Sequence, residues 1–169
     1  MTSMRIAALL AGAGLALLAA APSGALAGEA SVRFVSPERF TDASLNGRRA
    51  VDADAPALRE LAAHIGRLAG GGLPAGQTLE VEVTDVDLTG RVEPWRIDNP
   101  DLRVVTGATW PRIALRYRLR EGERVIRSGE ERLSDQAFEM RPGRIQSGDR
   151  LFSEKAMLDD WFQARFRAG

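Results

Sequence analysis

Few residues of this chain have side chains suited to catalysis. His64 is the only histidine, and the chain has no cysteine. Thiol catalysis, thiolate metal sites and multi-histidine zinc sites are therefore excluded. The chain has no G-x-S-x-G, H-E-x-x-H or S-x-x-K motif, so a hydrolytic triad would have to join His64 to a serine and an acid through the fold alone. His64 lies on the flank of an apolar helical stripe, which favours a surface position.

Two aspartates are the other candidates for acid–base work. Asp85 and Asp87 are two residues apart at the end of an alternating segment, so in an extended chain they share one face. With Asp98, Asn99 and Asp101 they offer the oxygen ligands that Ca²⁺ prefers, but the spacing differs from that of an EF-hand loop. Aspartates are also common in loops for purely local reasons. We therefore predict no metal site and no cofactor.

The strongest candidate for binding is a pair of tryptophans, each close to an arginine. Both stand near the ends of an irregular segment, residues 89–109. Tryptophan rings can stack on a sugar or peptide while arginine donates hydrogen bonds. The competing interpretation is that both rings anchor the segment on the core. We predict a binding surface that contains Trp95, Arg96, Trp110, Arg112, Asp85 and Asp87.

Four arginines alternate along residues 110–120 and could bind phosphate or sulfate groups. Glu80 and Glu82 lie on the polar face of the preceding alternating segment. If the two strands pair, these acids face Arg116 and Arg118 and form cross-strand ion pairs of about 0.2–1 kcal/mol each. We favour charge pairing over anion binding for this row.

Hydrophobic periodicity predicts the elements that position these residues. Segments 31–35, 78–83, 110–120 and 124–133 indicate strands, and the last two form a hairpin. One helix begins near Pro56, with Asp54 as a possible cap, and ends at the glycines 70–72; Ser153 caps a second helix. The order predicts a two-layer α+β domain, in which a mostly antiparallel sheet of about four strands carries two helices on one face.

The same periodicity predicts one core beneath the sheet. Two long segments, residues 89–109 and 134–150, lack this periodicity and are predicted to be irregular. The members of the core alternate along the strands or recur at helical spacing. We expect the following residues to be buried together: Leu61, Ile65, Leu79, Val81, Val83, Ile113, Leu115, Tyr117, Leu119, Leu158, Trp161 and Phe162.

The first 27 residues indicate export. Arg5 is the only charge before an apolar run over residues 6–21, and Ala25-Leu26-Ala27 ends the segment. This pattern is typical of a signal peptide, and the run is short for a membrane span of about 20 residues. We predict cleavage near Ala27, a periplasmic or secreted location, and a single domain over residues 28–169. Without Arg5 the chain has 22 basic and 23 acidic residues, which does not favour a nucleic-acid partner.

Five segments resemble a bacterial family of small exported proteins called domain of unknown function 3016. The resemblance covers nearly all of residues 28–169 and implies an exported single domain, but it carries no catalytic residues. The segments are FVSPERFTD at 34–42, LPAGQTLEVEVTDVDLTG at 73–90, EPW at 93–95, TWPRIALRYRL at 109–119 and EKAMLDDWF at 154–162.

The missing nucleophile, metal and phosphate-loop motifs favour a protein that binds without catalysis. We predict a periplasmic binding or assembly module for an envelope component or a protein partner, with no membrane span after cleavage. The alternative is a hydrolase of cell-envelope material that uses His64 or the Asp85 and Asp87 acids. A third possibility is a structural partner that pairs through a free strand edge.

Overall fold

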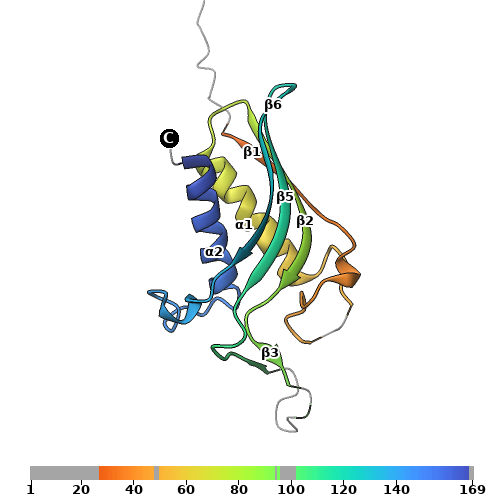
Figure 1. Ribbon diagram of the computed structural model, residues 1–169, viewed down its shortest axis with the longest axis vertical. Coiled ribbons are helices and arrows are strands. Elements are labelled where there is room, and N and C mark those ends of the chain that lie inside the picture. The colour runs from red at the N-terminus through yellow and green to blue at the C-terminus, as the bar shows by residue number, and fades with distance from the viewer. Residues whose placement is uncertain (1–26, 48–49, 94, 96–101, 168–169) are drawn as a thin grey trace, which may run out of the picture.

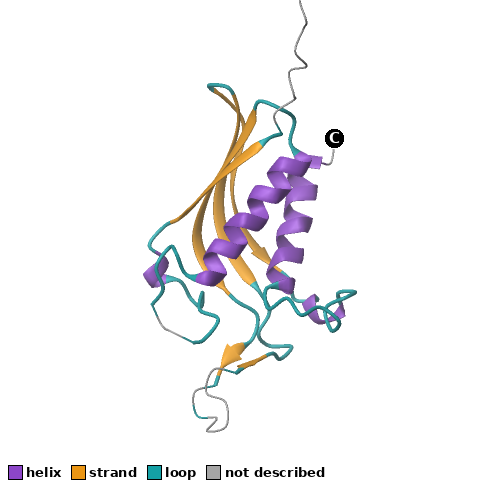
Figure 2. Ribbon diagram, turned by 180° about the vertical axis from the view of Figure 1, so that it is seen from behind, coloured by secondary structure: helices purple, strands orange, loops and turns teal. Residues whose placement is uncertain are grey.

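The computed structural model describes residues 27–47, 50–93, 95 and 102–167, and it has two layers (Figures 1 and 2). One layer is a four-stranded sheet in the order β1-β2-β5-β6, and both helices cover one of its faces. The predicted α+β class is confirmed. The elements of this unit are β1 Glu29–Phe34, α1 Pro56–Gly72, β2 Gln77–Asp87, β5 Arg112–Glu121, β6 Arg124–Ser134 and α2 Phe152–Phe162.

The sheet is mixed because β1 runs parallel to β2, whereas β2–β5 and β5–β6 are antiparallel. A separate two-stranded ribbon, β3 Arg91–Val92 with β4 Arg103–Val104, projects from the end of the sheet where β2 ends and β5 begins (Figure 1). This ribbon lies within the segment 89–109 that the sequence indicates as irregular. None of the described helices is long and apolar enough to cross a lipid bilayer.

The helix-facing side of the sheet forms the core. All the residues predicted to be buried there are buried, and Leu79, Leu115 and Leu158 are fully inaccessible. Burying a side chain of this size stabilises the fold by about 1.5–3 kcal/mol relative to exposure. Alternation along β2 and β5 therefore fixes which face of each strand packs on the helices.

Strand β2 continues to Asp87, beyond the alternating segment 78–83. The alternation stops before the strand ends because a bulge interrupts it. The register with β5 shifts between Val83 and Asp85. After the extra residue the next buried apolar side chain is Val86, three positions beyond Val83 rather than two. A bulge of this kind changes the faces of the residues that follow it. Asp85 and Asp87 therefore lie on the face opposite Val86, at the end of the sheet from which the ribbon projects.

The predicted helix caps are wrong. Helix α1 starts from Ala55, and α2 starts from Leu151, in both cases without a hydrogen bond from a capping side chain. Ser153 lies inside the first turn of α2. The end of α1 is as predicted, because the helix ends at Gly72. A Cβ atom on Gly72 would lie 2.4 Å from Phe162 Cε1, so glycine is needed where the two helices approach.

The open face of the sheet carries charged side chains in the expected register. Glu80 lies opposite Arg118 and Glu82 opposite Arg116. The ion pairs that form are different from those expected. The outer strands β1 and β6 supply partners for Glu82 and Arg116, and Glu80 pairs diagonally with Arg120 of β5. The side chains of these pairs are largely exposed, so each pair contributes about 0–1 kcal/mol. The pairs are Arg33 with Glu82, Arg116 with Glu130, and Arg120 with Glu80.

Candidate functional site

Three of the predicted site residues meet at the end of the sheet from which the ribbon projects. Asp87, the last residue of β2, faces Arg112, the first residue of β5. Arg112 Nε donates a hydrogen bond of 2.9 Å to Asp87 Oδ2. The Arg112 guanidinium also lies 5.2 Å from the centre of the half-buried Trp110 ring. The side chain of Asp87 is only 2% exposed, so this carboxylate depends on its partners for stability.

A second carboxylate, that of Asp42, is bound by the ribbon. Arg103 on β4 holds Asp42 through two parallel contacts, Nη1 to Oδ2 at 3.0 Å and Nη2 to Oδ1 at 3.1 Å. Arg103 Nη1 also donates to the carbonyl of Gly90 at 2.8 Å. The side chain of Arg103 is 9% exposed. A two-point arginine–carboxylate contact fixes direction as well as distance, so it orients the ribbon.

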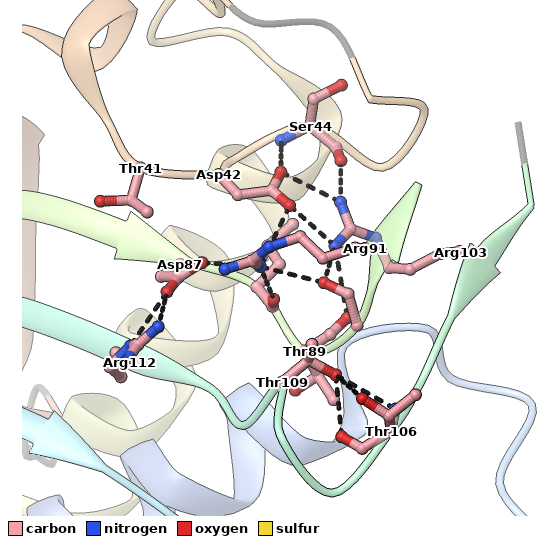
Figure 3. A network of polar contacts seen from close by, with 12 residues as sticks. Thr41, Asp42, Ser44, Asp87, Thr89, Arg91, Arg103, Thr106, Thr109 and Arg112 are labelled. Carbon is pink, nitrogen blue, oxygen red and sulfur yellow. Dashed lines mark hydrogen bonds and ion pairs between the residues drawn. The ribbon is translucent and has the colours of Figure 1, made fainter. Parts of the chain in front are cut away.

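Arg91 on β3 connects the two carboxylates (Figure 3). Its Nη1 lies 2.8 Å from Asp87 Oδ1 and 3.5 Å from Asp42 Oδ2. We call the five residues Asp42, Asp87, Arg91, Arg103 and Arg112 the aspartate–arginine network. It joins the segment after β1, the end of β2, the ribbon and the start of β5. Three guanidiniums share two carboxylates, so no carboxylate charge in the network is left without a cation.

Asp85 is engaged by the backbone beside this network. Its Oδ1 accepts a hydrogen bond from the Thr41 amide at 2.7 Å, and its Oδ2 accepts one from Thr41 Oγ1 at 2.8 Å. The neighbouring Asp42 continues the direction of β1 through an isolated parallel bridge to Asp87. The Asp85 and Asp87 carboxylates therefore hold the segment after β1 and the ribbon onto the sheet.

His64 lies in a different place, between the two helices. Its Nε2 is 2.8 Å from Asp159 Oδ1 on α2, and its Nδ1 is 3.4 Å from Arg67 Nη2. In a hydrolytic triad the nitrogen opposite the acid faces a nucleophilic hydroxyl. Here that nitrogen faces a guanidinium. Among the described residues no group of histidine, aspartate and glutamate side chains is arranged to hold a metal ion.

Glu154 on α2 ties that helix to the ribbon. It is 1% exposed, and its Oε1 accepts a 2.6 Å hydrogen bond from the amide of Thr89, just before β3. Burial raises the pKa of Glu154, although the hydrogen bonds from Thr89 and the positive charge of Arg103 oppose that rise. The sheet, the ribbon and α2 are thus joined at one place by carboxyl groups.

Large apolar side chains are exposed around this joint. Trp95, beyond β3, is 72% exposed, so it does not anchor its segment on the core. Leu102 and Val105, on either side of β4, are 42% and 38% exposed. Met140 and Ile145, between β6 and α2, are 85% and 86% exposed. Arg96, Asp98, Asn99 and Asp101 lie outside the described residues.

The two segments that carry these side chains are neighbours. Val105 lines the same pocket as Arg144 and Ser147. A Cβ atom on Gly107 would lie 3.3 Å from Glu139 Oε2. We call the surface made by the ribbon, residues 102–109 and residues 138–150 the ribbon end. The β5–β6 hairpin lies at the opposite end of the molecule (Figure 1).

Sequence reasoning found Asp87, Arg112 and Trp110 but missed Asp42, Arg103 and Glu154. Residues 40–49 are polar overall and predict a loop. The apolar residues Phe40 and Ala43, on either side of Asp42, are buried, and they were the available sign that this segment packs on the sheet. Nothing in the local pattern links Arg103 to Asp42, because the two are 61 residues apart.

Comparison with known proteins identifies a family and no characterised relative. One family model, described as "Protein of unknown function (DUF3016)", matches residues 28–164. Searches of curated proteins and of solved structures found no match. The family match covers most of the chain, including the sheet, the ribbon and both helices.

The aspartate–arginine network predicts a large effect of Asp42→Asn. The change leaves Arg103 buried without its anion, so it should lower the free energy of unfolding by about 3–5 kcal/mol. The matched control is Glu130→Gln, which removes the same charge from the exposed pair with Arg116 and should cost less than about 1 kcal/mol. Urea titration measures both. Equal losses for the two variants would show that the network does not stabilise the fold.

The raised pKa of Glu154 predicts a pH-dependent effect of Glu154→Gln. A folded-state pKa above the ordinary value of 4.5 gives stability that is present below pH 4.5 and lost as pH rises through the folded-state value. The stability of the native chain relative to Glu154→Gln should therefore fall as pH is raised from 4 to 8. Urea titrations of both proteins across this range test it. A difference that is constant or grows with pH contradicts the assignment.

Proposed function

We propose that this chain, which belongs to the DUF3016 family of proteins of unknown function, is a non-enzymatic binding module of the bacterial cell envelope. Its partner is a protein, and the docking surface is the ribbon end. The observation that carries the proposal is the exposure of Leu102, Val105, Met140 and Ile145 on two adjacent segments, together with that of Trp95 beyond β3. Exposed apolar side chains gathered in one region commonly mark an interaction site.

The residue types favour a protein over other envelope components. Protein interfaces are enriched in aromatic residues, methionine and arginine. The ribbon end exposes Met140, and Trp95 is exposed beyond β3. Arg144 and Arg150 line the same pocket as Val105. Outside this region, the exposed large apolar residues of the described chain are Val125 and Ile126, on the distant hairpin strand. The apolar surface is thus concentrated at one end of the molecule.

The support beneath this surface suits recognition. Arg103 and Glu154 hold the ribbon to the sheet and to α2 through buried contacts. A surface that is already ordered before binding loses less conformational entropy when its partner arrives. Recognition segments mounted on a rigid sheet are a common arrangement.

The geometry does not favour the hydrolase alternative. Asp85 is bound by Thr41, and Asp87 is bound by Arg91 and Arg112. His64 pairs with Asp159 on α2 and is flanked by Arg67 instead of a hydroxyl. The candidate acids and the candidate base therefore belong to separate sets of contacts, and each set has a structural role.

The proposal includes export. The basic start, apolar run and Ala-Leu-Ala ending of residues 1–27 support a cleaved signal peptide. The family match begins at residue 28, immediately after the expected cleavage point. In the host cell we expect the protein in the periplasmic fraction, with Gly28 as its first residue. N-terminal sequencing of the fractionated protein checks this, and a cytoplasmic product that retains Met1 would contradict it.

Site-specific photo-crosslinking in the host cell tests the docking surface. The crosslinking residue p-benzoylphenylalanine replaces Met140 at the ribbon end or Glu123 at the opposite hairpin. Both side chains are exposed, so neither change should disturb folding. A protein should crosslink at position 140 and not at position 123. Adding Ile145→Ser should weaken that product at least about tenfold, as expected for loss of an interface anchor.

Two outcomes would contradict the proposal. Equal crosslinking at the two positions would show that contact at the ribbon end is non-specific. Crosslinking at position 140 to lipid or glycan alone would make an envelope polymer the partner instead of a protein. Val125→Ser, which alters an exposed apolar residue of the distant hairpin strand, is the matched control for Ile145→Ser and should leave the product unchanged.

A further inference from the structure

A small polar pocket forms part of the ribbon end, and its capacity to bind a small ligand is separate from the docking of a protein. Its volume is about 220 Å³, and it lies between β4, the segment before α2 and the first residues of α2. It stands on its own contacts, so it does not depend on the proposed protein partner. The residues that line it are Thr89, Arg103, Val105, Arg144, Ser147, Asp149, Arg150, Phe152 and Ser153.

Two of the arginines that line this pocket each have one buried hydrogen-bond donor without a partner among the described residues. The Nε atoms of Arg103 and Arg144 are buried and have no hydrogen-bond partner among the described residues. The side chain of Arg103 is more than nine-tenths buried. A buried donor without an acceptor costs about 1–3 kcal/mol, more when it is charged.

The pocket has an excess of positive charge. Asp149 is its only acidic lining residue, and its carboxylate is occupied by Lys155 Nζ at 2.7 Å and by the amide of Leu151 at 2.8 Å. Arg150 donates to the neutral carbonyl of Leu45. Arg144 lies over the Phe138 ring, 5.2 Å from its centre. Neither Arg144 nor Arg150 forms an ion pair with a described residue.

The start of α2 adds to this positive field. The helix is 11 residues long and begins at the pocket without a capping side chain. The amides of a helix N-terminus and the helix dipole both favour an anion. Behind the pocket, burial raises the pKa of Glu154 and so favours its neutral form. Ser147 and Ser153 supply hydroxyl groups to the lining.

We infer that this pocket binds a phosphate group through Arg144, Arg150 and the N-terminus of α2. Planar guanidiniums and helix amides match the oxygens of a phosphate. A volume of about 220 Å³ is below the roughly 300–1,000 Å³ of pockets that enclose whole small molecules. The group is therefore free inorganic phosphate or the phosphate end of a larger monoester whose remainder stays outside.

Nuclear magnetic resonance titration of the chain, in chloride buffer of low ionic strength, tests the inference. Inorganic phosphate and glycerol 3-phosphate are the two ligands. Saturable shifts are expected at the amides of Leu151, Ser153 and Glu154. Arg144→Gln should weaken binding at least tenfold. Arg150→Gln is a second variant with an exposed side chain and should also weaken it. Arg127→Gln, which removes an exposed arginine of β6, is the matched control and should bind as the native chain does.

The two ligands distinguish the source of the phosphate. Binding of both at similar affinity supports a monoester as the natural ligand, and binding of inorganic phosphate alone supports the free ion. Absence of saturable shifts with either ligand overturns the inference. Shifts that persist unchanged in Arg144→Gln, or that weaken equally in Arg127→Gln, also overturn it, because they would reflect net charge and not this pocket. None of these results bears on the crosslinking at position 140.

Discussion

The rest of the structure depends on the ion pairs that two aspartates form with arginines at one end of the sheet. Asp42 and Asp87 are 15% and 2% exposed at the side chain, so each needs a cation within contact distance. Arg103 and Arg91 supply these cations from the ribbon, and Arg112 supplies another from β5. Because the cations come from separate segments, satisfying the charges also fixes where those segments lie.

This constraint explains how a short ribbon can hold a defined position away from the main core. The strands β3 and β4 have two residues each, too few for an isolated hairpin to be stable in water. The contact from Arg103 to Asp42 and the hydrogen bond from Thr89 to Glu154 replace the missing sheet contacts. The apolar side chains at the ribbon end and the pocket at α2 are both positioned by this joint.

The sequence was a good guide where one local pattern governs structure. Alternation in β2 and β5 predicted the buried faces through Leu79, Leu115 and their neighbours, because side chains alternate with a period of two in any strand. It failed at the bulge after Val83, which breaks that period, and at the helix starts, where Ala55 and Leu151 take the cap positions expected for Asp54 and Ser153.

The candidate site was predicted in part for the same reason. The predicted pairing of the two strands brings Asp87 close to Arg112, and the bulge after Val83 sets them directly opposite each other. Asp42, Arg103 and Glu154 come from segments with no shared periodicity, and only the three-dimensional fold joins them. Trp95 was singled out because of its residue type, and its exposure of 72% argues against the interpretation that it anchors its segment on the core.

Native-state hydrogen exchange tests most directly whether the buried charges hold the ribbon to the fold. The amide of Thr89 donates to Glu154 and that of Gly90 to the carbonyl of Thr109. If the joint is part of the cooperative fold, both amides should exchange only through global unfolding, with protection close to that of the central strand β5. Exchange of both at the rate of an unstructured peptide, while β5 stays protected, would show that the ribbon moves independently and would contradict this account.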